Sequence, residues 1–170
     1  PMFWRMDQQI NIYGDEATLL MLETRFDYMF HKAESSPPYF RVPLVSNKIT
    51  NSRIIIGDFS IEPYIQDHGV SGQSLGFIFN EQFAYSTDVA NMDASTLSKL
   101  RGINTWVVDC LRETKSLAHS DVQKTLEWIK VVEPKETFLT HMTSDIDYDE
   151  ISRKLPFNVK PAHDGLIINL

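Results

Sequence analysis

From residue 59 onward, histidine and aspartate side chains repeatedly follow short apolar runs, and these residue types can bind metal ions or transfer protons. Runs of this length, rich in Ile, Val, Phe, Tyr and Thr, are typical of β-strands. In open α/β sheets, ligands bind beyond the carboxyl ends of the strands. We therefore expect one site that is assembled from several loops. Its candidate residues are His68, Asp88, His141 and His163.

Imidazole nitrogens and carboxylate oxygens on separate loops suit Zn²⁺, Mn²⁺ or iron. The carboxylate of Asp88 has two oxygens and can bridge two ions, while His68 and His163 each offer one neutral nitrogen. Taken alone, each of these residues could be an ordinary turn residue, because Gly69 follows His68 and Asp164-Gly165 follows His163. Taken together, they favour a metal site.

The remaining histidines are less informative. His141 is flanked by Thr140 and Thr143, and it could be a metal ligand, a general acid or the neighbour of a helix cap. We expect His31 to be structural, because a cation in the last turn of a helix suits the helix dipole. His119 directly precedes a predicted helix start and is also expected to be structural. The sequence contains no nucleophile elbow, P-loop or H-E-x-x-H motif.

The elements that position these residues follow from hydrophobic periodicity and turn residues. Strands are predicted at 10–14, 39–45, 53–57, 59–65, 75–79, 83–86, 105–111, 137–140, at Val159 and at 166–170. Helices are predicted from Asp15 to about His31, at 94–100, from a capping box at 120–123 to Pro134, and from 147 to Pro156. Strands come first and then alternate with helices, which predicts an α/β (α+β) fold of sheets covered by helices.

Length and composition indicate one soluble domain over residues 1–170. The net charge of −7 disfavours charge-driven binding to nucleic acid or to an anionic membrane, but it does not exclude metal ions. The single cysteine, Cys110, cannot form an internal disulfide and is expected to be a buried core thiol. The sequence has neither a leader nor an apolar stretch of about 18 residues, so we expect a cytoplasmic protein.

Several segments resemble the metallo-β-lactamase-fold hydrolases, in the branch that includes phosphoribosyl 1,2-cyclic phosphate phosphodiesterase and relatives of the tRNA 3′-processing endonuclease. The resemblance extends from about Ile10 onward and rests on Gln66-Asp67-His68-Gly69, Ser74-Leu75-Gly76-Phe77, Tyr85-Ser86-Thr87-Asp88, Val108-Asp109-Cys110-Leu111-Arg112, Leu139-Thr140-His141-Met142 and Pro161-Ala162-His163-Asp164-Gly165. It implies an αββα sandwich with a dinuclear metal centre at one edge. By this resemblance His68 would bind one metal ion, Asp88 would bridge both, and His163 would bind the other. His141 would be the acid that protonates the leaving oxygen.

One part of the family pattern is missing. The H-x-H-x-D-H motif supplies four metal ligands upstream of a segment like 10–15, and it does not occur in this sequence. We therefore expect the chain to be the C-terminal two-thirds of such a domain, with truncation favoured over degeneration. Alone, it should have a partial or empty metal site and be nearly inactive. An apolar face around Phe3, Trp4 and 10–12 should then be covered by the missing segment or by a second copy of the chain.

The resemblance implies a metal-dependent hydrolase that uses two divalent ions, Zn or Mn. The expected reaction is attack of a metal-activated hydroxide on a small or cyclic phosphate ester. The alternatives are a lactone or thioester hydrolase on the same fold, and an inactive fragment or binding subunit. The acidic chain has no basic arm, which argues against tRNA as the substrate. The expected partner is therefore a small-molecule phosphate ester, with neither membrane nor nucleic acid.

Overall fold

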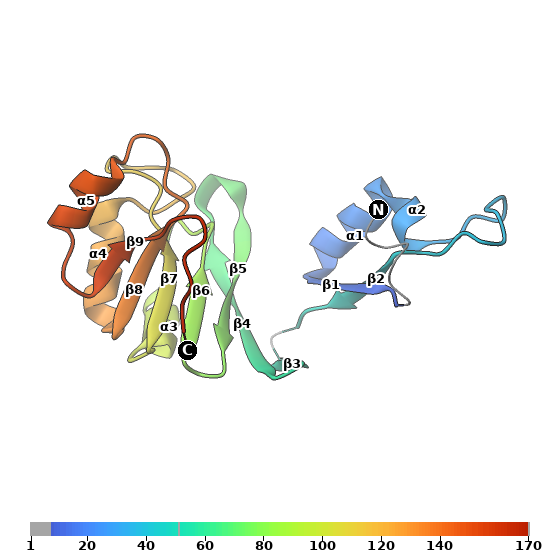
Figure 1. Ribbon diagram of the computed structural model, residues 1–170, viewed down its shortest axis with the longest axis horizontal. Coiled ribbons are helices and arrows are strands. Elements are labelled where there is room, and N and C mark those ends of the chain that lie inside the picture. The colour runs from blue at the N-terminus through green and yellow to red at the C-terminus, as the bar shows by residue number, and fades with distance from the viewer. Residues whose placement is uncertain (1–7, 51, 170) are drawn as a thin grey trace. The chain divides into compact units, whose positions relative to one another are not determined.

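The computed structural model describes residues 8–50 and 52–169. The chain divides into two compact units, Pro1–Ser52 and Arg53–Leu170 (Figure 1). That residues 1–170 belong to one domain stays a prediction. Within the described parts of the chain, no helix combines the length and the apolar character needed to cross a membrane.

The first unit is built on a two-stranded parallel sheet. Its elements are β1 (Ile10–Gly14), α1 (Glu16–Arg25), α2 (Asp27–Phe30) and β2 (Leu44–Lys48), and Ile10 pairs with Leu44. The predicted cap of α1 is confirmed, because an Asp15 carboxylate oxygen accepts a hydrogen bond from the Thr18 amide at 3.0 Å.

Two predictions for this unit are wrong in detail. The helix expected to reach His31 breaks at Phe26, whose backbone (φ −126°, ψ 38°) is not helical. The strand expected at 39–45 instead begins at Leu44. Pro43 has no amide hydrogen, and its carbonyl accepts the Ile10 amide at 2.8 Å, so regular pairing starts after it. Of the apolar face expected near the chain start, Ile10 is exposed, whereas Phe3 and Trp4 lie outside the described residues.

The second unit contains a seven-stranded mixed sheet with strand order β3-β4-β5-β6-β7-β8-β9 (Figure 1). The strands are β3 (Ile54–Ile56), β4 (Phe59–Asp67), β5 (Gln73–Phe79), β6 (Phe83–Ser86), β7 (Thr105–Asp109), β8 (Glu136–Thr140) and β9 (Val159–Pro161). The helices are α3 (Ala94–Leu100), α4 (Val122–Val132) and α5 (Tyr148–Lys154). The mixed α/β class predicted from the sequence is confirmed.

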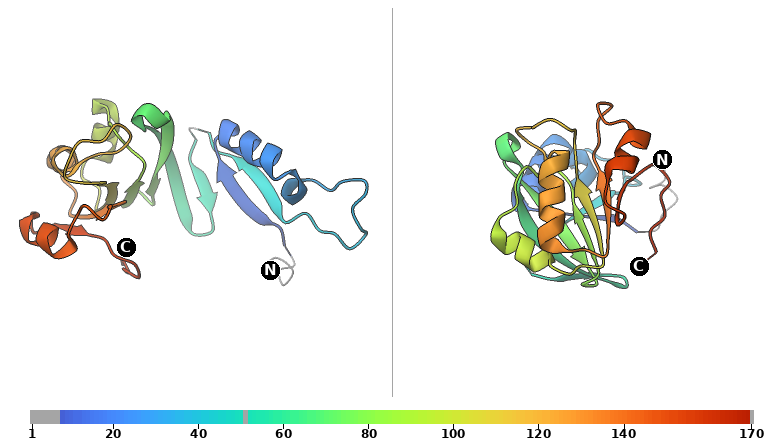
Figure 2. Two further views of the ribbon diagram at one scale, coloured as in Figure 1. Left: turned by 90° about the horizontal axis from the view of Figure 1, so that it is seen from above. Right: turned by 90° about the vertical axis from the view of Figure 1, so that its left-hand side faces the viewer.

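Helices α3 and α4 pack on one face of this sheet, and α4 is seen in front of the strands in the right-hand view of Figure 2. The predicted apolar stripe of α4 faces inward, with Ile129 and Val132 buried. Both contact the same core as Trp106, which is fully buried on β7. The sheet is therefore fixed by a continuous core, and the loops at its edge extend from a rigid base.

Several boundaries in this unit differ from the predictions; β4, for example, continues to Asp67 rather than ending at Ile65. Strand β7 ends at Asp109 rather than at Leu111, because the Leu111 amide leaves the sheet and donates to the Ser120 carbonyl at 3.0 Å. The cap of α4 is Asp121, whose carboxylate accepts from the Lys124 amide at 2.9 Å. Ser120 is buried instead. Residues 166–169 form no strand.

Strand direction decides where the candidate residues lie. Strands β4, β5 and β6 are successively antiparallel, so β4 and β6 run the same way. Strands β6 to β9 are parallel. The carboxyl ends of β4, β6, β7, β8 and β9 therefore lie at one edge of the sheet, hereafter the carboxyl edge. Each candidate residue follows one of these strands, as the sequence argument requires.

Candidate metal site

His68 directly follows β4 and is held by the loop that precedes α4. Its Nδ1 lies 2.6 Å from the carbonyl oxygen of Ala118. A carbonyl only accepts, so Nδ1 carries the hydrogen and Nε2 keeps its lone pair. The two loops pack tightly here, because a Cβ added to Gly69 would lie 1.9 Å from the carbonyl oxygen of Leu117. The glycine next to His68 thus allows the contact that fixes the imidazole.

Asp88 follows β6 in a left-handed conformation, with φ +57°. Such a backbone is uncommon outside glycine and is tolerated best by Asn, Asp and His. Neighbouring side chains hold the segment in place. Ser74 Oγ donates to the Asp88 carbonyl at 2.7 Å, and the buried Gln66 donates through Nε2 to the Thr87 carbonyl at 2.9 Å. The Asp88 carboxylate is thereby aimed from a fixed turn.

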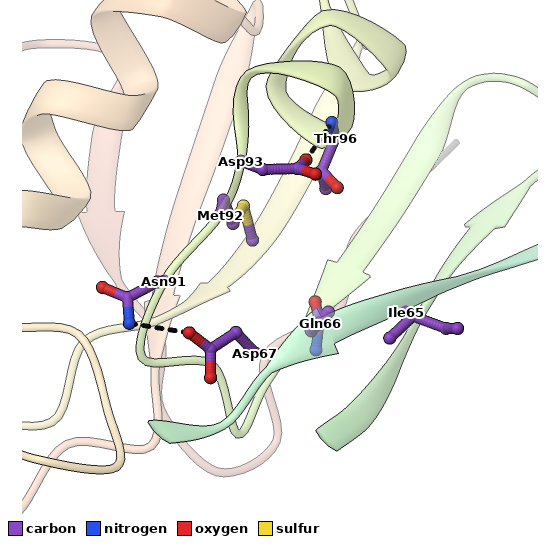
Figure 3. Close-up of a pocket in the computed structure, with 7 residues that line it drawn as sticks. All are labelled: Ile65, Gln66, Asp67, Asn91, Met92, Asp93 and Thr96. Carbon is purple, nitrogen blue, oxygen red and sulfur yellow. Dashed lines mark hydrogen bonds between the residues drawn. The ribbon is translucent and has the colours of Figure 1, made fainter. Parts of the chain in front are cut away.

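Asp67 connects the loop that contains His68 to the segment after Asp88 through hydrogen bonds. Its carboxylate accepts from the Gly69 amide at 2.7 Å and from Asn91 Nδ2 at 2.8 Å. The Asn91 bond is the largest cause of the lowered pKa of the Asp67 carboxyl. Asp67 also lines a cavity of about 240 Å³, shown in Figure 3. The second acidic residue of this cavity, Asp93, caps α3 through the Thr96 amide, so both carboxylates there serve structural roles.

Asp109 and His119 form a hydrogen-bonded pair at the end of β7. His119 Nδ1 lies 2.8 Å from Asp109 Oδ2, and the same oxygen accepts from the Val89 amide at 3.1 Å. The Asp109 side chain is fully buried. Burial raises the pKa of its carboxyl, while the hydrogen bonds from His119 and Val89 act in the opposite direction. With Nδ1 bound to the carboxylate, His119 has Nε2 free.

His141 follows β8 and is also left-handed, with φ +64°. Its ring stacks on that of His119, with centroids 4.6 Å apart and an interplanar angle of 21°. Its Nε2 lies 3.8 Å from Asp88 Oδ1, and its side chain is 40% exposed. His141 therefore combines a fixed position beside Asp88 with access from solvent, as a proton donor to a bound substrate requires.

Four of these side chains lie close together at the carboxyl edge and are hereafter called the carboxyl-edge cluster. They are His68, Asp88, His119 and His141. His68 Nε2 lies 3.7 Å from Asp88 Oδ1. One ligand atom each from His68, Asp88 and His119 can be chosen so that all three lie within 4.8 Å of one another. Two imidazoles whose Nδ1 is engaged and whose Nε2 is free, facing one carboxylate, are a donor set that fits Zn²⁺ or a related ion.

His163 lies apart from this group. It follows β9, its Nδ1 is 3.0 Å from the carbonyl oxygen of Asp164, and its ring centroid lies 6.4 Å from that of Tyr148. Its side chain is exposed, and it is not among the three residues whose ligand atoms gather within 4.8 Å in the described part of the chain. The assignment of His163 as a ligand stays a prediction.

Two further residues have structural surroundings. Cys110 is fully buried, as predicted, and burial raises the pKa of its thiol to about 12. His31 pairs with Asp27 through Nδ1 at 2.7 Å in the first unit. His119 is the residue that the sequence reasoning undervalued. It lies ten residues beyond its strand, and the one available indication was the acidic Asp109 inside an otherwise apolar run.

A family model described as the beta-lactamase superfamily domain matches residues 2–142. No curated protein matches the chain. Among solved structures, a new diphosphatase from the PhnP family is 24% identical with a TM-score of 0.81, and the match covers 94% of this chain and 57% of that one.

Two other solved structures show the same fold. Zn²⁺-bound PqqB from Methylobacterium extorquens is 14% identical with a TM-score of 0.72, over 98% of this chain and 67% of that chain. Human tRNase Z, short form, is 14% identical with a TM-score of 0.64, and the match covers 97% of this chain and 69% of that chain. The chain thus spans between 57% and 69% of the length of these proteins. At such identities the likeness establishes a common fold, and the predicted metallo-β-lactamase type is confirmed.

Proposed function

The chain belongs to the beta-lactamase superfamily, a family of hydrolases, and from this membership and the carboxyl-edge cluster we propose that it acts in metal-dependent hydrolysis of a phosphodiester. The observation that carries the proposal is the convergence of His68, Asp88 and His141 at one sheet edge, with the Nε2 of His68 free. The names of two similar structures, a diphosphatase and a tRNase, support a phosphate linkage over a lactone or thioester.

His68 and Asp88 are the residues that would hold a metal ion, Zn or Mn. When bound, the metal supplies a Lewis acid and lowers the pKa of water so that a nucleophile forms near neutral pH. The chain's own part is to fix the ligands. The Ala118 carbonyl fixes the tautomer of His68, and the Ser74 hydroxyl holds the turn of Asp88. We further propose that Asp88 bridges two ions and that His163 binds the second one.

We assign His141 as the acid that protonates the leaving oxygen. Its ring is braced by the stacked His119, and its Nε2 lies on the side of Asp88. A donor at this position delivers a proton to the ester oxygen as its bond to phosphorus breaks. Partial exposure lets the imidazole regain a proton from water after each turnover.

The substrate class that we propose is a small or cyclic phosphate ester. The net charge of −7 opposes binding of a long polyanion, whose affinity depends on many Lys and Arg contacts to phosphate. A small ester needs only the metal and a few neighbouring groups. Residues 1–170 alone are expected to turn over slowly, because His68 and Asp88 leave part of a two-ion site unsupplied.

The test is a substrate panel run on the full reading frame that encodes the chain and, in parallel, on residues 1–170. Bis-p-nitrophenyl phosphate, a cyclic ribose phosphate and a lactone are incubated with each protein after loading with Zn²⁺ or Mn²⁺. Where the reading frame supplies the H-x-H-x-D-H ligands, we expect metal-dependent hydrolysis of the phosphate esters, with little hydrolysis by residues 1–170. Preferential lactone hydrolysis would support the alternative reaction. Metal-loaded protein that cleaves none of these esters would point to a binding subunit.

A further inference from the structure

We propose that His119 is a third protein ligand for the metal ion at His68 and Asp88, with the buried Asp109 as its hydrogen-bond partner. The inference rests on the proposed metal site and extends it to a residue for which the sequence favoured a structural role. The carboxyl-edge cluster then contains a three-ligand site for one ion within residues 68–119.

The orientation of the His119 ring is the first support. Its Nδ1 is bound to Asp109 Oδ2 at 2.8 Å, so Nε2 is the nitrogen left for a metal. The His68 ring is arranged in the same way, with Nδ1 bound to a carbonyl at 2.6 Å. Metal-binding histidines almost always donate their second ring N–H to a carboxylate or a backbone carbonyl. His68 has a backbone carbonyl as this partner, and His119 has a carboxylate.

The charge of Asp109 is the second support. Its side chain is fully buried, and Oδ1 has no hydrogen-bond partner among the described residues. Within that same part of the chain, its one ion pair is with His119. A buried carboxylate is costly unless a positive charge compensates it. A divalent ion on His119 Nε2 would supply that charge through the imidazole, in the carboxylate–histidine–metal arrangement.

The distances are the third support. Tetrahedral zinc with bonds of about 2.1 Å separates its ligand atoms by about 3.4 Å. One ring nitrogen each of His68 and His119 and one carboxylate oxygen of Asp88 lie within 4.8 Å of one another, and His68 Nε2 is 3.7 Å from Asp88 Oδ1. The widest possible gap exceeds the tetrahedral spacing by about 1.4 Å, and rotation of the Asp88 carboxylate, whose side chain is 44% exposed, can close part of it. Three protein ligands leave one position of a catalytic zinc open for water or substrate.

This assignment revises one expectation from the sequence. With only His68 and Asp88 as ligands, residues 1–170 should hold a metal ion poorly. With His119 added, the same residues should hold one ion with useful affinity. The chain would then bind one metal ion without being an efficient catalyst, since the second ion would have only Asp88 and His163 as ligands.

The test measures Zn²⁺ affinity of residues 1–170 by competition with a chromophoric chelator. The central variant is His119→Phe, which keeps an aromatic ring between His68 and His141 but removes the nitrogen. We expect it to weaken binding by more than about 100-fold. Asp109→Asn keeps an oxygen that can accept from His119 Nδ1 but removes the negative charge, and it should weaken binding by about 10- to 100-fold, as for other changes to a ligand's hydrogen-bond partner. His31→Ala is the matched control and should bind like the wild type, because His31 pairs with Asp27 in the first unit. Urea denaturation of each metal-free variant checks folding.

A measurement on the unaltered chain guards against misfolded variants. In ¹⁵N NMR spectra, Zn²⁺ should shift the His119 Nε2 resonance strongly and leave Nδ1 in its hydrogen-bonded position. The third-ligand assignment is overturned if His119→Phe binds zinc as the wild type does while His68→Ala and Asp88→Ala lose it. If all three variants keep full affinity, the metal site on which the proposed function rests is wrong as well.

Discussion

Replacing Gly69 with alanine should damage both the fold and the site, because this glycine lies where two loops of the carboxyl edge touch. Its φ is +61°, a conformation that costs an L-residue about 1–2 kcal/mol. The added Cβ would lie 1.9 Å from the Leu117 carbonyl oxygen, whereas real Cβ contacts stay above 3.0 Å, so the loops must separate by about 1 Å.

That separation strains two hydrogen bonds. They are the Val70 amide to the Leu117 carbonyl at 3.2 Å and His68 Nδ1 to the Ala118 carbonyl at 2.6 Å. Each is worth about 0.5–1.5 kcal/mol. Together with the backbone cost, Gly69→Ala should lower the free energy of unfolding by about 2–5 kcal/mol. It should also weaken Zn²⁺ binding, because His68 loses the partner that fixes its ring.

Gly57→Ala is the matched control. Gly57 has nearly the same φ, +58°, but a Cβ there would meet nothing within 4 Å. The free energy of unfolding of Gly57→Ala should fall only by the backbone cost of about 1–2 kcal/mol, and its metal affinity should not change. Urea denaturation followed by tryptophan fluorescence measures both variants, since Trp106 and Trp128 lie in the core of this unit. Equal losses of stability and of metal affinity in the two variants would refute the role given to the Gly69–Leu117 contact.

Three further predictions concern single residues. His141→Ala should lower kcat by about 10²–10⁴-fold with metal content unchanged, and the loss of kcat should be smaller when p-nitrophenolate is the leaving group than when the leaving group is poor. Loss of metal, or an equal loss of kcat for all leaving groups, would contradict the acid role. Cys110 should react slowly with a thiol reagent at pH 8 in the folded chain and rapidly in urea, since burial raises its pKa to about 12; fast reaction of the native chain would show an open core. Asp121→Ala should cost about 1 kcal/mol of stability through the lost cap of α4, with no change expected for Asp145→Ala.

The sequence predicted best what local chemistry decides. Aspartates at 93 and 147 cap the helices that were expected there, and the Phe83–Ser86 strand lies where the hairpin pattern placed it. Predictions failed where a distant partner decides the outcome. The position of β2 depends on parallel pairing with β1, which lies more than thirty residues earlier and leaves no local pattern.

The candidate site follows the same division. His68, Asp88 and His141 each directly follow a strand or lie within two residues of one, so strand order alone brings them together. His119 reaches the site from inside a long loop, and only its hydrogen bond to Asp109 reveals its position. His163 also follows a strand, yet its side chain is exposed and lies near Tyr148. Proximity to a strand end thus predicts the edge on which a residue lies. The neighbouring residues decide whether its side chain joins the cluster at that edge.

The central claim is that the carboxyl edge binds metal through Asp88. It is tested most directly by the metal content of residues 1–170 after equilibrium dialysis against Zn²⁺ or Mn²⁺, measured by elemental analysis. The wild type and Asp145→Ala, which removes an exposed carboxylate from the loop after His141, should retain bound metal. Asp88→Ala should lose it, and more completely than His163→Ala. Equal metal content in the wild type and Asp88→Ala would contradict the claim.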